Sequence, residues 1–189
     1  MQIKEIDNFA NIQEQMEIIQ YLHSEFTHGL QTTTVSGQDK NELRTKLSVD
    51  NPQFVKLIFS GGTYNETNYF IDSKFFPLVY SLLHKNKLSN YFIDRIKINT
   101  TFPYPNTTKK NYGLIHPDFT LPNRKGMSII YYINNSDGDT VFFDNNLNEK
   151  KRISPRQGKA IVFDSDIYHA GSCPINSPYR QIINFVLYK

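Results

Sequence analysis

The sequence predicts an α+β fold, with helices in the first half of the chain and short strands in the second. Apolar residues recur at about 3.6-residue spacing in residues 9–26 and 73–87, which is typical of amphipathic helices. From residue 92 onward, apolar residues recur at every second position. Gly, Asn, Asp and Pro then separate short apolar runs at 128–134, 140–143, 160–164 and 180–188. This order of elements predicts a double-sheet jelly roll or barrel braced by helices.

The first helix is expected over residues 9–26, with its apolar stripe at Phe9, Ile12, Met16, Ile19, Leu22 and Phe26. His23 and His28 are five residues apart, so they do not share a helix face, and we expect both on the surface. Residues 29–40 are expected to form a loop and residues 41–47 a short helix. Residues 53–59 fit a strand or a buried helix, and Gly61-Gly62 ends that segment.

The second helix is expected over residues 73–87, with Ser73 as its N-cap and Pro77 in its first turn, where a missing N–H costs little. In residues 92–102, Ile96 and Ile98 alternate with polar side chains, which predicts a strand.

Composition narrows the class of protein without naming an activity. The chain has 39% hydrophobic and 21% charged residues and a net charge of +3, which is too small to indicate nucleic-acid binding by itself. Cys173 is the single cysteine, so no internal disulfide forms, as is usual in a reducing compartment. We expect a cytoplasmic protein, because no apolar run reaches the roughly 18 residues of a membrane span and no signal-peptide pattern is present.

The motif that organises the chain is His116-Pro117-Asp118, followed 51 residues after Asp118 (169 − 118) by His169. On an extended segment, side chains two residues apart lie on one face, so His116 and Asp118 are expected to point the same way. Two histidine nitrogens and one carboxylate suit a divalent metal such as Fe(II), with open positions opposite the ligands. A closed structural zinc site would instead commonly use several cysteines.

Further motifs around these residues resemble the iron(II)- and 2-oxoglutarate-dependent dioxygenases, specifically their prolyl 4-hydroxylase-like branch. The matching elements are His116-Pro117-Asp118, Tyr131-Tyr132-Ile133-Asn134, Gly138-Asp139-Thr140, Phe163-Asp164, His169 and Arg180. They cover roughly residues 92–188, in the order that the family has them. The resemblance implies a double-stranded β-helix (jelly-roll) core.

The resemblance also implies cofactors and their ligands. His116, Asp118 and His169 are expected to hold Fe(II), Arg180 to pair with the distal carboxylate of 2-oxoglutarate, and Tyr132 to donate a hydrogen bond to it. A fixed guanidinium suits this task because it binds a carboxylate through two parallel hydrogen bonds. Ascorbate is a candidate reductant. Tyr131 is expected to point to the opposite face and to pack in the core.

The sequence departs from the family at two places. Family members often carry a tyrosine upstream of the His-x-Asp strand, where Phe102 aligns and Tyr104 is a possible substitute. The nucleic-acid demethylases of the superfamily carry a second arginine six residues after the first, and Val186 stands there in this chain. Although basic residues occur together at Lys109-Lys110, Arg124-Lys125 and Lys150-Lys151-Arg152, we expect a protein, peptide or small-molecule substrate rather than nucleic acid.

The sequence thus predicts a single domain, with residues 1–90 as mainly helical support and residues 91–189 as the catalytic core. Its expected reaction is hydroxylation of a C–H bond, for instance on a prolyl or other protein side chain, with release of succinate and CO2. Two alternatives stay open: a jelly-roll binding module without catalytic activity, and a cupin-like metal-dependent isomerase or hydrolase. The sequence does not identify the substrate or the oligomeric state.

Overall fold

The computed structural model of the chain describes residues 2–24, 29–32, 52–61, 69–118 and 125–189. Within them the elements follow the order β1 (Ile3–Ile6), α1 (Ile12–Ser24), β2 (Gly29–Thr32), β3 (Pro52–Gly61), β4 (Tyr69–Ile71), α3 (Phe76–Lys85), β5 (Phe92–Thr101), β6 (Gly126–Tyr132), β7 (Thr140–Phe143), β8 (Glu149–Ile153), β9 (Ala160–Asp164), β10 (His169–Gly171) and β11 (Arg180–Tyr188). The α+β class and the jelly-roll architecture predicted from the sequence are confirmed.

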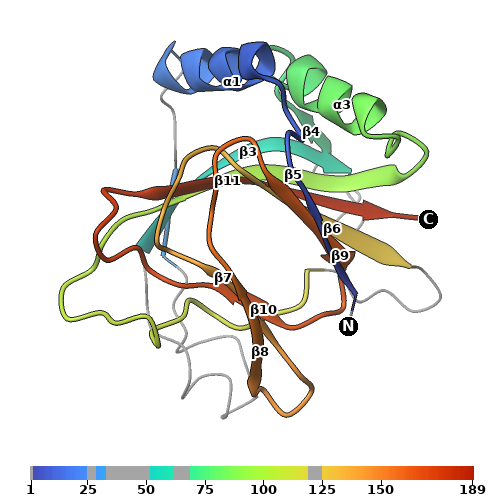
Figure 1. The fold of residues 1–189 in the computed structure, drawn as a ribbon. Helices are drawn as coiled ribbons and strands as arrows, with labels where there is room; N and C mark the ends of the chain where they lie inside the picture. Colours follow the sequence, from blue (N-terminus) through green and yellow to red (C-terminus); the bar gives the residue numbers. More distant parts are fainter. Residues whose placement is uncertain (1, 25–28, 33–51, 62–68, 119–124) are drawn as a thin grey trace.

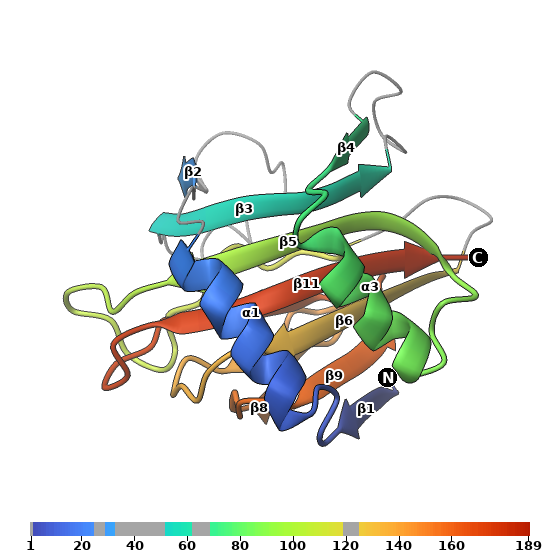
Figure 2. The same ribbon diagram turned by 90° about the horizontal axis from the view of Figure 1, so that it is seen from above.

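The strands form two sheets. The larger has the order β1-β9-β6-β11-β5-β3-β2, with β4 attached to β3, and the smaller has the order β10-β7-β8. Every described strand pair is antiparallel. Helices α1 and α3 lie side by side on one face of the larger sheet, and the smaller sheet lies across the other face (Figure 1). Seen from above, both helices cross the central strands β5, β11 and β6 (Figure 2).

Side-chain alternation in the central strands separates two interiors. One set packs beneath the helices and includes Ile96 and Ile98 of β5, Tyr131 of β6 and Phe185 of β11. The other set faces the smaller sheet and includes Ile130, Tyr132 and Ile182, which pack with Phe142 and Phe163. As predicted, Tyr131 and Tyr132 therefore occupy opposite faces of the sheet.

The first helix begins at Ile12 rather than at residue 9, and its predicted apolar stripe is partly wrong, while Phe26 lies outside the described residues. Ile12 and Met16 are 77% and 60% exposed, whereas Ile18 and Leu22 are buried. A helix that covers a sheet buries one face only, and the face that packs here is rotated toward Ile18. Phe9 is buried as predicted, although it precedes the helix.

Two other local predictions are corrected. Ser73 is not the N-cap of the second helix, because Phe75 occupies that position. The carboxylate of Asp72 instead accepts hydrogen bonds from the backbone amides of Lys74 and Phe75, each at 3.1 Å. Gly29–Thr32 form β2 against β3 rather than a loop. Residues 53–59 are strand, within β3, while the short helix expected at 41–47 lies outside the described residues. Pro77 lies in the first turn of α3, as predicted.

Residues 1–90 contribute more strand than their sequence pattern indicated. Besides α1 and α3 they supply β1 to β4, and β3 pairs with β5 along most of its length. The pairing matters for function, because it extends the inner face of the larger sheet beyond β5. No helix in the described part of the chain is long and apolar enough to cross a membrane.

Candidate active site

The structure brings His116, Asp118 and His169 together between the two sheets. One ligand atom from each lies within 4.8 Å of the other two, and no other group of three His, Cys, Asp or Glu side chains in the described residues is gathered in this way. An isolated antiparallel bridge joins the two histidines: the amide of His116 donates to the carbonyl of His169 at 3.0 Å, and the reverse bond is 3.1 Å. Backbone pairing therefore sets the spacing of the two imidazoles.

Both imidazoles are oriented by backbone carbonyls. Nδ1 of His116 lies 2.8 Å from the carbonyl of Leu114, and Nδ1 of His169 lies 2.9 Å from that of Ile167. A carbonyl only accepts, so Nδ1 carries the hydrogen and Nε2 keeps its lone pair. Nε2 of His169 lies 3.4 Å and Nε2 of His116 lies 3.9 Å from the carboxylate of Asp118. Burial, followed by repulsion from His169, lowers the pKa of His116 and favours the neutral ring that a metal requires.

The Asp118 carboxylate is buried and held from three strands. Ser128 of β6 donates to Oδ2 at 2.7 Å, Asn184 of β11 donates to Oδ1 at 3.1 Å, and Arg95 of β5 contacts Oδ1 at 3.2 Å. Burial alone raises the pKa of Asp118, but the two histidines and Arg95 outweigh it and hold the pKa well below its usual range. The site therefore contains an ionised, oriented carboxylate beside two lone pairs.

A second group lies around Arg180, the first residue of β11, which is only 4% exposed. Its Nε donates to the carbonyl of Gly138 at 2.8 Å and its Nη2 to the hydroxyl of Thr140 at 2.9 Å. Burial lowers the pKa of this guanidinium, yet arginine stays charged in proteins. No carboxylate in the described residues lies within ion-pair distance of it, so the buried charge is available for an anionic ligand.

Thr140 is a contact that the sequence reasoning did not single out. Its Oγ1 accepts hydrogen bonds from Arg180 and from the Tyr132 hydroxyl, each at 2.9 Å. Both lone pairs are then occupied, and the hydroxyl hydrogen of Thr140 remains to be donated. Thr140 lines the cavity beside the histidines, whereas Tyr132 does not line the cavity and packs in the apolar cluster between the sheets. The Gly138-Asp139-Thr140 motif was the signal that could have indicated this role.

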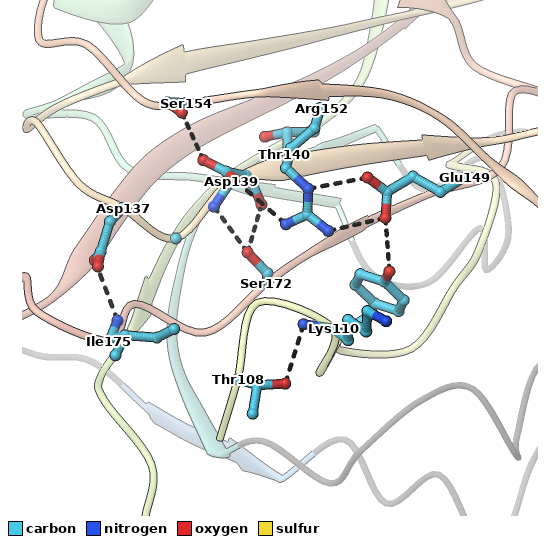
Figure 3. A network of polar contacts seen from close by, with 12 residues as sticks. Thr108, Lys110, Asp137, Asp139, Thr140, Glu149, Arg152, Ser154, Ser172 and Ile175 are labelled. Atoms are coloured by element: carbon cyan, nitrogen blue, oxygen red, sulfur yellow. Dashed lines mark hydrogen bonds and ion pairs between the residues drawn. The ribbon is translucent and has the colours of Figure 1, made fainter. Parts of the chain in front are cut away.

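Polar contacts behind Thr140 hold its loop in place (Figure 3). The buried carboxylate of Asp139 accepts from Ser154 at 2.7 Å and pairs with Arg152 at 3.3 Å, and Arg152 in turn contacts Glu149 at 2.9 Å. The amide of Asp139 donates to the hydroxyl of Ser172 at 2.8 Å. These bonds connect β8 and the segment after β10 to the residues that orient Arg180.

A cavity of about 240 Å³ connects the two groups. Its walls come from both sheets and from residues 113–116, and consist of Gln53, Lys97, Asn99, Thr101, Gly113, Leu114, His116, Ile130, Thr140, His169, Ala170, Gly171, Arg180, Ile182 and Asn184. Asn99 Oδ1, Thr101 Oγ1 and Asn184 Oδ1 are buried and have no hydrogen-bond partner in the part of the chain that the structure describes. Buried polar atoms are rarely left unpaired, so their presence in a cavity wall indicates a bound ligand or water.

Neither aromatic residue considered upstream of the His-x-Asp motif lines this cavity. Phe102 borders a separate apolar cavity of about 510 Å³ with Leu22, Phe54 and Tyr179, and Tyr104 is 49% exposed. Thr101 occupies the cavity wall instead. Cys173 is buried and is not part of the cluster that contains the histidines.

Comparison with known proteins agrees with this geometry. Residues 104–188 match the family model of the 2OG-Fe(II) oxygenase superfamily. This match contains both histidines, Asp118, Tyr132 and Arg180, and it confirms the resemblance to iron(II)- and 2-oxoglutarate-dependent dioxygenases. Over residues 104–188 the chain is thus similar to enzymes that use Fe(II) and 2-oxoglutarate, and it carries a candidate metal cluster in that segment. No curated protein sequence matches it.

Solved structures show the same fold at low sequence identity. An oxidoreductase of the 2OG-Fe(II) oxygenase family from Burkholderia pseudomallei has a TM-score of 0.65 and 13% identity, over 99% of this chain and 84% of the other. A Trichoplax adhaerens prolyl hydroxylase, in complex with a hypoxia-inducible-factor peptide fragment, has a TM-score of 0.60 and 15% identity, over 98% and 82%. The epimerase SnoN from nogalamycin biosynthesis has a TM-score of 0.56 and 8% identity, over 98% and 77%.

The residues present fit the two cofactors of the superfamily. Two Nε2 lone pairs and one ionised carboxylate converge within 4.8 Å, as three-residue Fe(II) sites require. Arg180 and Thr140 offer a charge and hydrogen-bond donors for a carboxylate in the same cavity. Because the co-substrate is a dianion, a buried guanidinium to which no described carboxylate is paired complements it.

Proposed function

We propose that this chain is an Fe(II)- and 2-oxoglutarate-dependent dioxygenase that hydroxylates a C–H bond, with residues 1–189 acting as a single domain. In this proposal His116, Asp118 and His169 hold Fe(II), and Arg180 binds the distal carboxylate of 2-oxoglutarate. One observation carries it: a buried guanidinium with no carboxylate partner among the described residues shares a cavity of about 240 Å³ with two lone-pair-bearing histidines beside an ionised aspartate. A binding module without catalytic activity gives no reason to maintain both groups in one cavity.

When bound, the cofactors supply the oxygen chemistry, in which 2-oxoglutarate is decarboxylated to succinate and CO2 while the substrate gains a hydroxyl group. The protein's residues bind and orient. Ser128, Asn184 and Arg95 fix both carboxylate oxygens of Asp118. Carbonyl groups of Leu114 and Ile167 fix the imidazoles in the tautomer that presents Nε2 to the cavity.

At the other end, Arg180 and Thr140 are the residues that contact the distal carboxylate in this proposal. Tyr132, which the resemblance assigned to that carboxylate directly, orients Thr140: its hydroxyl donates to Thr140 Oγ1 and leaves the threonine hydrogen for the ligand. Burial raises the pKa of Tyr132, so its phenol keeps the hydrogen that this arrangement needs.

We propose a protein, peptide or small-molecule substrate. The Trichoplax adhaerens enzyme, whose fold resembles this chain, was solved with a peptide, whereas SnoN is an epimerase, so the shared fold leaves the substrate class open. Nucleic acid is disfavoured because Val186 is buried in place of a second arginine. In addition, Lys150, Lys151 and Arg152 each pair with an acidic side chain within the protein. We also propose a cytoplasmic location, consistent with the single, buried Cys173.

The proposal is tested by succinate formation from 2-oxoglutarate under air with Fe(II) and ascorbate. The parent protein is expected to release succinate, and the His169→Ala variant is not. The control is Asp166→Ala, at an exposed residue outside the site. A parent protein that binds Fe(II) but releases no succinate, with or without a substrate panel, would indicate an isomerase, hydrolase or binding module instead.

A further inference from the structure

The inner face of β5 carries a row of polar side chains that the proposed function does not fully use. Arg95, Lys97, Asn99 and Thr101 alternate with Ile96 and Ile98, whose side chains are buried beneath the helices. A solvent-facing sheet normally carries such polar residues, but three members of this row, from Lys97 to Thr101, line the cavity between the sheets. Their side chains therefore face whatever binds there.

Strand register divides this row between the two ends of the cavity. Thr101 pairs with Arg180, at the end assigned to 2-oxoglutarate's distal carboxylate. Lys97 pairs with Asn184, whose amide donates to Asp118, at the metal end. Directly paired residues of antiparallel strands lie on one face with Cβ atoms about 5 Å apart. The ammonium group of Lys97 thus belongs to the neighbourhood of the metal ligands.

Lys97 has no hydrogen-bond or ion-pair partner within the described ranges of the chain, in contrast to its neighbour. Arg95 contacts Asp118 at 3.2 Å, whereas no acidic side chain of the described residues lies within ion-pair distance of Lys97. Burial, and then the positive charge of Arg95, lower the pKa of Lys97 to about 8, although Asp118 opposes the shift. The ammonium is still mostly protonated at pH 7, and an anion beside it would relieve the unfavourable burial.

The charge balance of the site remains positive after both cofactors are counted. Asp118 contributes −1 and the three cations Arg95, Lys97 and Arg180 contribute +3, which leaves +2 (3 − 1). Fe(II) adds two positive charges and 2-oxoglutarate two negative ones, so the sum does not change. An uncharged substrate would leave this excess in a partly desolvated cavity, while a substrate with a carboxylate would reduce it.

The co-substrate is short relative to the spacing of the two strand positions from which these cations project. Four residues separate Lys97 from Thr101 along β5, about 13 Å at 3.3 Å per residue. The four C–C bonds of a five-carbon diacid span at most about 6 Å. With the distal carboxylate assigned to Arg180, we assign the anion at Lys97 to a second molecule, and the comparison of Lys97→Met with Arg180→Met below tests this assignment.

We propose that Lys97 binds a carboxylate of the primary substrate, so that the enzyme acts on an acidic compound rather than on a neutral prolyl ring. This inference rests on the proposed function and specifies its substrate class. The carboxylate comes from a free amino acid or from an acidic residue of a peptide. Leu57 of β3, which pairs with Lys97 on its other side and is 37% exposed, provides an apolar surface next to the ammonium.

The test uses the full chain loaded anaerobically with Fe(II) and 2-oxoglutarate. The probes are the common free amino acids, their primary amides, and prolyl tripeptides with Glu or Gln next to proline. Binding is measured as a change in the visible charge-transfer band of the iron complex, and turnover as succinate released above the rate without substrate. We expect carboxylate-bearing probes to act and their amide counterparts to act at least tenfold more weakly. The amino-acid and tripeptide arms distinguish the two sources of the carboxylate.

The variant is Lys97→Met, which removes the charge while keeping length. The KM of the best acidic probe is expected to rise about 10-fold to 100-fold, as when a hydrogen-bonded charge is lost. Lys4→Met is the matched control, because Lys4 is an exposed lysine of β1 with no contact to the cavity, and it should behave as the parent. Affinity for 2-oxoglutarate should fall far less in Lys97→Met than in Arg180→Met.

Three results overturn the inference: amides that act as well as acids, no response to any acidic probe, or a Lys97→Met variant that handles acids like the parent. Loss of 2-oxoglutarate affinity in Lys97→Met as large as in Arg180→Met would instead make Lys97 a co-substrate anchor. Failure of the proposed function is a separate result, since a parent protein that binds neither Fe(II) nor 2-oxoglutarate would show it before any probe is added.

Discussion

The two faces of the central strands differ in what they contain. Beneath the helices, Ile96, Ile98 and Phe185 are fully buried among other apolar side chains. On the opposite face the same strands present Lys97, Asn99 and Asn184 to a cavity, and two of these carry buried polar atoms without partners. The helix-covered face stabilises the fold, and the inner face keeps unsatisfied groups for ligands. Because alternate residues of a strand point to opposite faces, the residues that form the apolar core and those that line the cavity alternate along the same strands.

The largest effect is expected from removing the charged metal ligand. Asp118→Ala should lower Fe(II) affinity by more than the roughly 10–100-fold typical of losing an outer-shell contact, because it removes a ligand itself. Equilibrium titration with Fe(II) under anaerobic conditions measures the effect. The control is Asp166→Ala. Asp139 is unsuitable as a control because it is buried and paired with Arg152. Equal affinities in Asp118→Ala and Asp166→Ala would remove Asp118 from the metal site.

A second large effect is expected at the other end of the inner face. Arg180→Ala should weaken 2-oxoglutarate binding by a factor of hundreds, because a buried carboxylate without its partner loses about 3–5 kcal/mol. Tyr132→Phe removes only the bond to Thr140, about 0.5–1.5 kcal/mol, so it should weaken binding about tenfold or less. Iron should bind in both variants, and Arg156→Ala, at an exposed residue, is the control. Parent-like 2-oxoglutarate affinity in Arg180→Ala would mean that another cation anchors the co-substrate.

The helix-covered face is tested by Ile98→Ala. Since Ile98 is fully buried, the substitution should lower the free energy of unfolding by about 2–5 kcal/mol. Chemical denaturation measures this, and 2-oxoglutarate affinity of the folded variant should stay near that of the parent. A change in affinity without a change in stability would contradict the separation of the two faces.

The opposite pattern is expected for Thr101→Val on the inner face. Its Oγ1 is buried without a partner, so an isosteric apolar side chain should leave stability within about 1 kcal/mol of the parent or raise it. Affinity for 2-oxoglutarate or substrate should decrease, because the wall loses a donor. A clear loss of stability with intact ligand affinity would show that Thr101 is a structural residue.

A pH-dependent effect is expected in the loop before β11. Partial burial raises the pKa of Asp137, but the amides of Asn176, Ser177 and Ile175 outweigh it and lower the pKa to about 2. A lowered pKa stabilises the fold at pH values above the ordinary value of 3.8, and this contribution is lost as the pH falls toward 2. Asp137→Asn should therefore cost about 1–2 kcal/mol at pH 7 and little at pH 2, measured by denaturation at both. A difference that persists at pH 2 would contradict this account.

The inner face also explains which features were predictable from the sequence. The bounds of β7, β9 and β11 agree with the predicted runs because their side chains are apolar and turn residues flank them. The proximity of His116, Asp118 and His169 followed from a motif whose spacing the fold preserves. Alternation in β5 was recognised as strand, but a period of two does not say which face meets solvent. That orientation depends on tertiary packing.

Other features were missed for similar reasons. Short strands such as β1 and β8, with the sequences IKEI and EKKRI, carry too few apolar residues to produce a pattern and exist because neighbouring strands pair with them. The orientation of α1 depends on which face meets the sheet, so Ile12 and Met16 were misjudged. Asn184 and Ser128 reach Asp118 through register between distant strands, for which one sequence contains no local signal.

The backbone bridge between His116 and His169 has a consequence for how the metal-free protein behaves. Reciprocal backbone hydrogen bonds of 3.0 and 3.1 Å, which use none of the candidate metal-ligand atoms, close the long loop between the two histidines. The conformational entropy lost on closing this loop is therefore lost when the chain folds, and not when the metal binds. Metal loading should therefore leave the hydrogen-exchange protection of β10 and its neighbours almost unchanged. The protein is expected to act as a rigid chelator that accepts and releases its ion without refolding, so that metal supply rather than protein conformation sets the loaded fraction.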